Sequence, residues 1–150
     1  MHTGSNTACW HIQCDGTALP NPGRMGIGGV LRSPDGVCHE FSVASGRQGC
    51  NNEAEALAVL HALQMAQALG AQHLEIASDS SVLVQHLNNG KRVSVVHLRD
   101  CFDALRETLD AFGNWKIAWV PRHRNSDADR LARAALGLQV SVSKPSQRRK

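Results

Sequence analysis

The residues with the clearest chemical potential are acids at the predicted ends of strands and helices. Asp15 ends a short apolar run near the start of the chain, and Asp79 ends a second apolar run. Glu55 and Asp129 each lie in the first turn of a predicted helix. If the first and fourth strands are parallel neighbours, Asp15 and Asp79 emerge side by side. The two helix starts can then supply the other two acids.

A cluster of these four acids would need a cation. Carboxylates in a partly buried site repel one another unless positive charge neutralises them. Sites built only from oxygen ligands select hard cations such as Mg²⁺ or Mn²⁺. Two such ions about 4 Å apart can activate a water molecule and stabilise the leaving oxygen in an in-line displacement at phosphorus. The expected chemistry is therefore phosphodiester hydrolysis.

Each acid also has an alternative structural role. Asp15-Gly16 is a turn signal, and Asp79 could cap the short helix that follows it. Glu55 and Asp129 could each complete a capping box with the polar residue three positions earlier, and acids in a first turn suit the helix dipole. Any one of these roles is reasonable alone, but the four acids together favour a metal site.

The elements that must position these acids follow from hydrophobic periodicity and turn residues. The first strand is predicted to end near residue 14. Four more strands are predicted over residues 26–31, 37–44, 73–77 and 115–120. Helices are predicted over residues 52–69, 81–87, 95–112 and 126–136, with loops at 46–50 and 121–125. The first three strands form an antiparallel meander, and the later two join in parallel through crossover helices. The predicted fold class is α/β, a mixed five-stranded sheet flanked by helices.

Length and composition predict one domain over residues 1–138 and a basic, disordered tail over residues 139–150 of the 150-residue chain. No apolar run is long enough for a membrane span, so we expect no membrane contact and a cytoplasmic location; a monomer is also expected. The net charge is +3; with four of thirteen acids offset by cations, sixteen basic residues face nine acids, an excess of +7. That excess suits a polyanion. The five cysteines include no Cys-x-x-Cys pair, which argues against a disulfide framework and a zinc site.

The motifs together resemble a known family. They are Asp15-Gly16 followed by Asn21-Pro22-Gly23, Asn51-Asn52-Glu53-Ala54-Glu55, Ser78-Asp79-Ser80, and His123-Arg124-Asn125 with Ala128-Asp129-Arg130-Leu131-Ala132. Over residues 8–138 the chain resembles ribonuclease H of type 1, especially the short bacterial, archaeal and plant RNase H-like domains. The resemblance implies a catalytic quartet that binds two Mg²⁺ ions, formed by Asp15, Glu55, Asp79 and Asp129. It also implies cleavage of the RNA strand of an RNA/DNA hybrid, leaving a 5′-phosphate and a 3′-hydroxyl.

The resemblance extends to substrate contacts. In this family a loop histidine is thought to help product release or proton transfer, and His123 is the candidate here. Hybrid recognition runs through the minor groove, where 2′-hydroxyls distinguish RNA from DNA. The positions it implies are Gly16, Asn21, Asn51, Asn52 and Asn125, with backbone of the glycine-rich turn approaching the sugar.

The chain also departs from the family pattern. Cys50 stands where the family often has Thr, and Ser81 stands where Gln is common. The basic helix with tryptophans found in long bacterial enzymes is replaced by residues 88–99, whose basic character rests on Lys91, Arg92, His97 and Arg99. We expect no hybrid-binding domain before residue 8, and the tail could compensate for the missing contacts.

Two other functions remain open. One is a non-catalytic nucleic-acid-binding module on the same fold, against which the presence of all four acids argues. The other is a nuclease of this fold that acts on structured or double-stranded RNA or on junctions. Exonuclease relatives usually carry Asp-x-Glu on the first strand, and Asp15-Gly16-Thr17 lacks it.

Overall fold

The computed structural model describes residues 8–89 and 96–138. Within these ranges the strands are β1 (Trp10–Leu19), β2 (Gly23–Arg32), β3 (Cys38–Gly49), β4 (His73–Ser78) and β5 (Asn114–Trp119). The helices are α1 (Asn51–Ala68), α2 (Ser81–Asn89), α3 (Val96–Leu109), the 3-10 turn η2 (Arg122–Arg124) and α4 (Ser126–Ala135). None of these helices is both long and apolar enough to cross a membrane.

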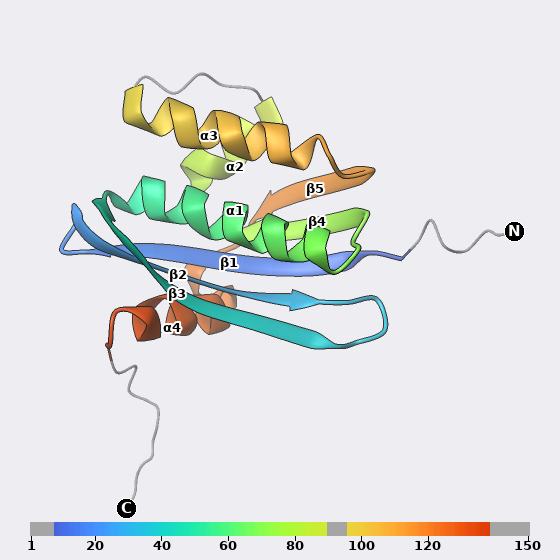
Figure 1. Ribbon diagram of the computed structural model, residues 1–150, viewed down its shortest axis with the longest axis horizontal. Coiled ribbons are helices and arrows are strands. Elements are labelled where there is room, and N and C mark those ends of the chain that lie inside the picture. Colours follow the sequence, from blue (N-terminus) through green and yellow to red (C-terminus); the bar gives the residue numbers. More distant parts are fainter. Residues whose placement is uncertain (1–7, 90–95, 139–150) are drawn as a thin grey trace, which may run out of the picture.

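The strands form one sheet in the order β3-β2-β1-β4-β5. β2 pairs antiparallel with β1 and β3, whereas β4 pairs parallel with β1 and β5. This confirms the predicted mixed sheet. Helices α1, α2 and α3 lie on one side of the sheet, and α4 packs on the other side against β1, β2 and β3 (Figure 1).

The core lies between the sheet and α1 and α3. Strand alternation turns Ile12 and Cys14 of β1 inward, each 1% exposed, and Phe102 of α3 is fully buried. The buried stripe of α1 is rich in alanine (Ala54, Ala58, Ala62, Ala66). Such small side chains let the helix lie close to β1, so the start of α1 is held against the strand that carries Asp15.

Two predicted boundaries are wrong near the start of the chain. β1 does not turn at Asp15-Gly16, because antiparallel pairing with β2 continues as far as Leu19 opposite Arg24. The chain reverses only after Leu19, at residues 20–22. β3 continues to Gly49 by pairing with β2, so most of the loop predicted at 46–50 is strand. The remaining elements lie within a few residues of their predicted bounds, with α3 ending at Leu109 rather than at residue 112.

Candidate active site

Asp15 lies inside β1, in the part of the strand that is no longer paired with β4. The parallel pairing of β1 with β4 ends at Gln13 opposite Ala77, so Asp15 stands just beyond it. Asp79 directly follows the last residue of β4. The first and fourth strands are therefore parallel neighbours as predicted, and their acids reach the same place.

Glu55 is brought to these acids by close contact between α1 and β1. The amide of Gly16 donates a hydrogen bond of 3.0 Å to Glu55 Oε1. A Cβ at Gly16 would lie 2.1 Å from the carbonyl oxygen of Ala54, so only glycine permits this approach. The result is a group of carboxylates from Asp15, Glu55 and Asp79 whose nearest oxygens all lie within 4.8 Å of one another.

Asp129 lines the same pocket but is paired with a cation. Arg133, one helical turn later on α4, donates from Nε to both carboxylate oxygens of Asp129 at 3.2 Å. The fourth predicted acid thus stands beside the other three, outside their group of mutually close oxygens. The i, i+4 spacing of the pair is the sequence signal that predicts this contact.

Burial makes the three close carboxylates costly without a cation. Asp15 is 5% exposed. Burial, followed by the charge of Asp79, raises the pKa of Asp15 to about 8. Burial and the charges of Asp15 and Asp79 raise the pKa of Glu55 well above its ordinary value. Asp79 Oδ2 is buried and has no hydrogen-bond partner among the described residues. A bound cation would relieve all of these penalties, so these residues fit a divalent metal.

The structure does not bear out the alternative roles of the acids in caps and turns. The residue at the N-cap of α1 is Cys50 and that of α4 is Asn125, and neither makes a side-chain capping bond. The amide of Leu83, in the first turn of α2, is bonded by the hydroxyl of Ser80 rather than by Asp79. Asp15 lies within a strand rather than in a turn. The acids are therefore not needed for turns or caps.

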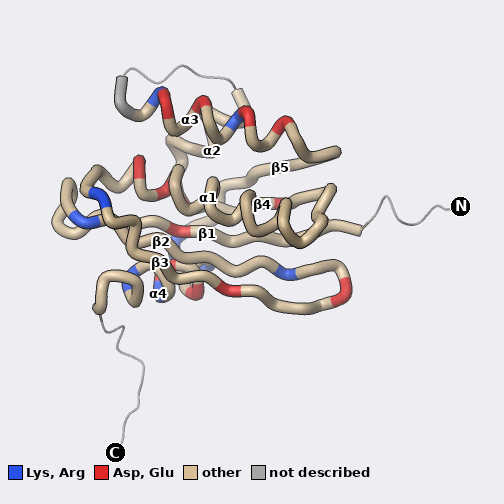
Figure 2. Tube along the Cα trace, in the orientation of Figure 1, with Lys and Arg blue, Asp and Glu red and all other residues tan. Residues whose placement is uncertain are grey.

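The carboxylates line a pocket of about 240 Å³. Its wall includes the predicted residues Gly16, Asn51 and Asn52. It also includes Thr17, Ser80, Ser81, Arg122 and Arg133, none of which is among the predicted site residues. In Figure 2 acidic residues mark β1 and α1, whereas α3 and α4 each carry both signs of charge.

The predicted asparagines fall into two groups. Asn21 Oδ1 accepts a hydrogen bond of 3.0 Å from the amide of Asn51, whose own Oδ1 accepts one of 2.8 Å from Ala18. These bonds tie the turn after β1 to the start of α1. Asn125 is fully buried and donates a hydrogen bond of 2.8 Å to the carbonyl of Cys14. Its side chain therefore connects α4 to β1 in the interior, where a substrate would not reach it.

Other predicted contacts lie away from the pocket. His123 is exposed in η2, and the residue of this turn that lines the pocket is its neighbour Arg122. The glycines of β2 have a structural role, because a Cβ at Gly26 or Gly28 would lie 2.4 Å from the backbone of Ala132 in α4. These glycines therefore let α4 pack closely against the sheet. Lys91, Arg92 and the tail at 139–150 lie outside the described residues.

Comparisons with known proteins agree with this geometry. A family model described as "Reverse transcriptase-like" matches residues 13–135. The chain is 36% identical over 127 residues to ribonuclease HI of Halobacterium salinarum, covering 84% of this chain and 63% of that protein. It is 33% identical over 127 residues to a bifunctional protein of Mycobacterium tuberculosis, covering 83% of this chain and 35% of that protein. The chain thus spans about one to two thirds of the length of these relatives.

Solved structures give the same grouping. The crystal structure of RNase H1 from H. salinarum superposes with a TM-score of 0.81 at 35% identity, covering 86% of this chain and 98% of that one. LC11-RNase H1, crystallised in complex with an RNA/DNA hybrid, superposes with a TM-score of 0.78 at 29% identity, covering 85% and 96%. The chain therefore belongs to the reverse-transcriptase-like family and, within it, to the ribonucleases H of type 1.

Proposed function

We propose that this chain is a metal-dependent endoribonuclease that hydrolyses the RNA strand of RNA/DNA hybrids. The observation that carries the proposal is the group of Asp15, Glu55 and Asp79, of which Asp15 is buried and the other two are partly buried. Their nearest oxygens lie within 4.8 Å of one another, and none of the three forms an ion pair within the described residues. Membership of the type 1 ribonucleases H and the hybrid bound by LC11-RNase H1 support the choice of substrate.

Asp15, Glu55 and Asp79 would hold the metal, and Asp129 would join them once Arg133 releases it. Oxygen-only ligands favour Mg²⁺, with Mn²⁺ as the alternative. Two bound ions of this kind would supply activation of the attacking water and stabilisation of the leaving oxygen. The products would carry a 5′-phosphate and a 3′-hydroxyl.

The rest of the pocket would bind and orient the substrate. Arg122 and Arg133 line it and supply positive charge that suits a phosphate backbone. Asn51 and Asn52, at the start of α1, line the same pocket. An amide both donates and accepts hydrogen bonds, which suits a ribose 2′-hydroxyl. A role for His123, a catalytic domain at residues 1–138, the basic tail, a monomeric state and a cytoplasmic location stay predictions.

The experiment is cleavage of end-labelled RNA/DNA hybrid, duplex RNA and duplex DNA in Mg²⁺, with EDTA and Asp15→Asn as controls. We expect internal cuts in the RNA strand of the hybrid, abolished by both controls, with fragments that carry a 5′-phosphate. Equal cleavage of duplex RNA would instead favour a nuclease for other structured nucleic acids. Hybrid binding without any cleavage would favour the non-catalytic module and overturn the proposal.

A further inference from the structure

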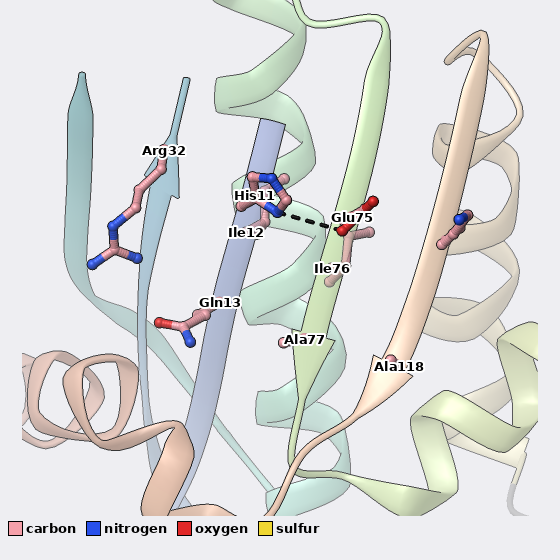
Figure 3. Close-up of a pocket in the computed structure, with 9 residues that line it drawn as sticks. His11, Ile12, Gln13, Arg32, Glu75, Ile76, Ala77 and Ala118 are labelled. Carbon is pink, nitrogen blue, oxygen red and sulfur yellow. Dashed lines mark ion pairs between the residues drawn. The ribbon is translucent and has the colours of Figure 1, made fainter. Parts of the chain in front are cut away.

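A thiol, an imidazole and a carboxylate, each a potential metal ligand, lie close together at β1 and β4. Cys9 directly precedes β1, His11 lies on β1 and Glu75 on β4, and one ligand atom of each lies within 4.8 Å of the others. Figure 3 shows His11 and Glu75 extending toward one another from adjacent strands, with Nδ1 and Oε1 3.5 Å apart.

The sheet itself fixes this arrangement. His11 and Glu75 are register partners in the parallel pairing of β1 with β4. Cys9 is two residues before His11, so strand alternation turns both side chains to the same side. Asp15 is four residues further along β1, about 13 Å away at the usual rise of a strand. Cys9, His11 and Glu75 do not line the carboxylate pocket.

The donor set differs in kind from the carboxylates of the candidate active site. A thiolate, an imidazole and a carboxylate are ligands of Zn²⁺, whereas Mg²⁺ prefers oxygen alone. Zinc sites with three protein ligands keep a fourth position for water or a substrate. Here a pocket of about 300 Å³ adjoins His11 and Glu75 and leaves space for that fourth ligand.

From this geometry we propose that Cys9, His11 and Glu75 form a Zn²⁺ site with an open fourth position, separate from the carboxylate pocket. The absence of a Cys-x-x-Cys pair argues against zinc at the level of sequence, because paired cysteines are a common local signature of a zinc site. The ligands proposed here come from two strands that are distant in the sequence, and only the register of β1 with β4 brings them together.

The charges around the site set its pH dependence. Burial and the Glu75 carboxylate raise the pKa of the Cys9 thiol, and the positive charge of Lys116 lowers it. Lys116 stands opposite Glu75 on β5. Metal binding would release the thiol proton to solvent, so we expect affinity to rise with pH. Without metal the exposed His11–Glu75 pair contributes little to stability, because solvent screens both groups.

The test is a titration of the full chain with Co²⁺, used as an optical probe for Zn²⁺, in excess Mg²⁺ to fill the carboxylate pocket. We expect a thiolate-to-cobalt charge-transfer band that saturates at one ion per chain and disappears when Zn²⁺ is added. Cys9→Ser should abolish the band. Cys38→Ser, at an exposed cysteine of β3, is the matched control and should leave it unchanged.

Two further variants test the other ligands. Glu75→Gln should weaken Co²⁺ binding by more than about tenfold, since even outer partners of metal ligands commonly contribute that much. Glu40→Gln, at an exposed glutamate of β3, should not. Thermal unfolding checks that each variant is folded. A band that survives Cys9→Ser, equal effects of the two glutamate variants, or the absence of any band in the folded wild type would overturn the proposal.

Discussion

Two parts of β1, around Asp15 and around His11, carry polar side chains in opposite surroundings. Asp15 is 5% exposed and lies among other carboxylates. The His11 side chain is 60% exposed, and its neighbours are a carboxylate, a thiol and, across the pocket, basic residues. Burial raises the pKa of Asp15 to about 8, because a buried charge loses its hydration and meets like charges.

This contrast separates two reasons why a group of side chains would bind a metal ion. At Asp15 the cation is needed to balance charge that solvent cannot reach. At His11 the charged groups are already hydrated by solvent, so charge balance does not require a metal. A metal would be selected there by the chemical identity of its ligands. The group around Asp15 should therefore respond strongly to removal of one carboxylate, and the group around His11 mainly to removal of the thiol.

The largest expected effect is loss of hydrolysis in Asp15→Asn. The variant removes a proposed metal ligand without changing volume, so we expect activity on the hybrid to fall by more than about a hundredfold. The melting temperature without metal should rise, because repulsion among the acids is relieved. Asp127→Asn is the matched control, since Asp127 is exposed on the same helix as Asp129 and pairs with Arg130 at 3.9 Å. Full activity of Asp15→Asn in the hybrid assay would contradict the site.

Gly16→Ala should disturb the part of β1 next to Asp15 through packing. Its Cβ would lie 2.1 Å from the carbonyl oxygen of Ala54, which forces α1 away and moves Glu55. We expect a loss of about 1–3 kcal/mol or more in the free energy of unfolding by urea. Gly113→Ala, whose Cβ would meet its nearest atom at an ordinary 3.5 Å, should change it by less than about 0.5 kcal/mol. Equal stability of the two variants would refute the close approach.

Asn125→Ala separates a structural asparagine from a substrate contact. The side chain is fully buried and bonded to Cys14, so we expect about 1–3 kcal/mol lower stability. Asn114→Ala, at an exposed position of β5, should have little effect. If Asn125 instead bound the substrate, its loss would raise KM for the hybrid and leave the melting temperature unchanged.

The smallest effect concerns pH. A carboxyl whose pKa is raised in the folded state binds more protons there than in the unfolded chain, so stability falls as pH rises. For Asp15 this loss runs from its ordinary pKa of 3.8 up to about 8. In EDTA we expect the melting temperature to fall by several degrees between about pH 5 and pH 9, at roughly 2–4 °C per kcal/mol. Asp15→Asn and added Mg²⁺ should each flatten this profile; a flat profile in the wild type would contradict the raised pKa.

The sequence predicts the framework well because local patterns encode it. Helical spacing and turn residues place α1 and α4, and crossover rules place β4 parallel to β1. The extension of β1 past Asp15 is not predictable in this way, since it depends on pairing with β2. Burial of Asn125 and the contact of Gly28 with α4 likewise depend on residues distant in the sequence. Local patterns therefore identify the acids but not the groups that position them.

The central claim is that Asp15, Glu55 and Asp79 form a binding site for divalent cations. Crystals grown with Mn²⁺ test it most directly, through the anomalous signal of the ion. We expect a peak between these three carboxylates in the wild type, and its loss or strong reduction in Asp15→Asn. A wild-type crystal in Mn²⁺ with an ordered pocket and no anomalous peak there would contradict the account.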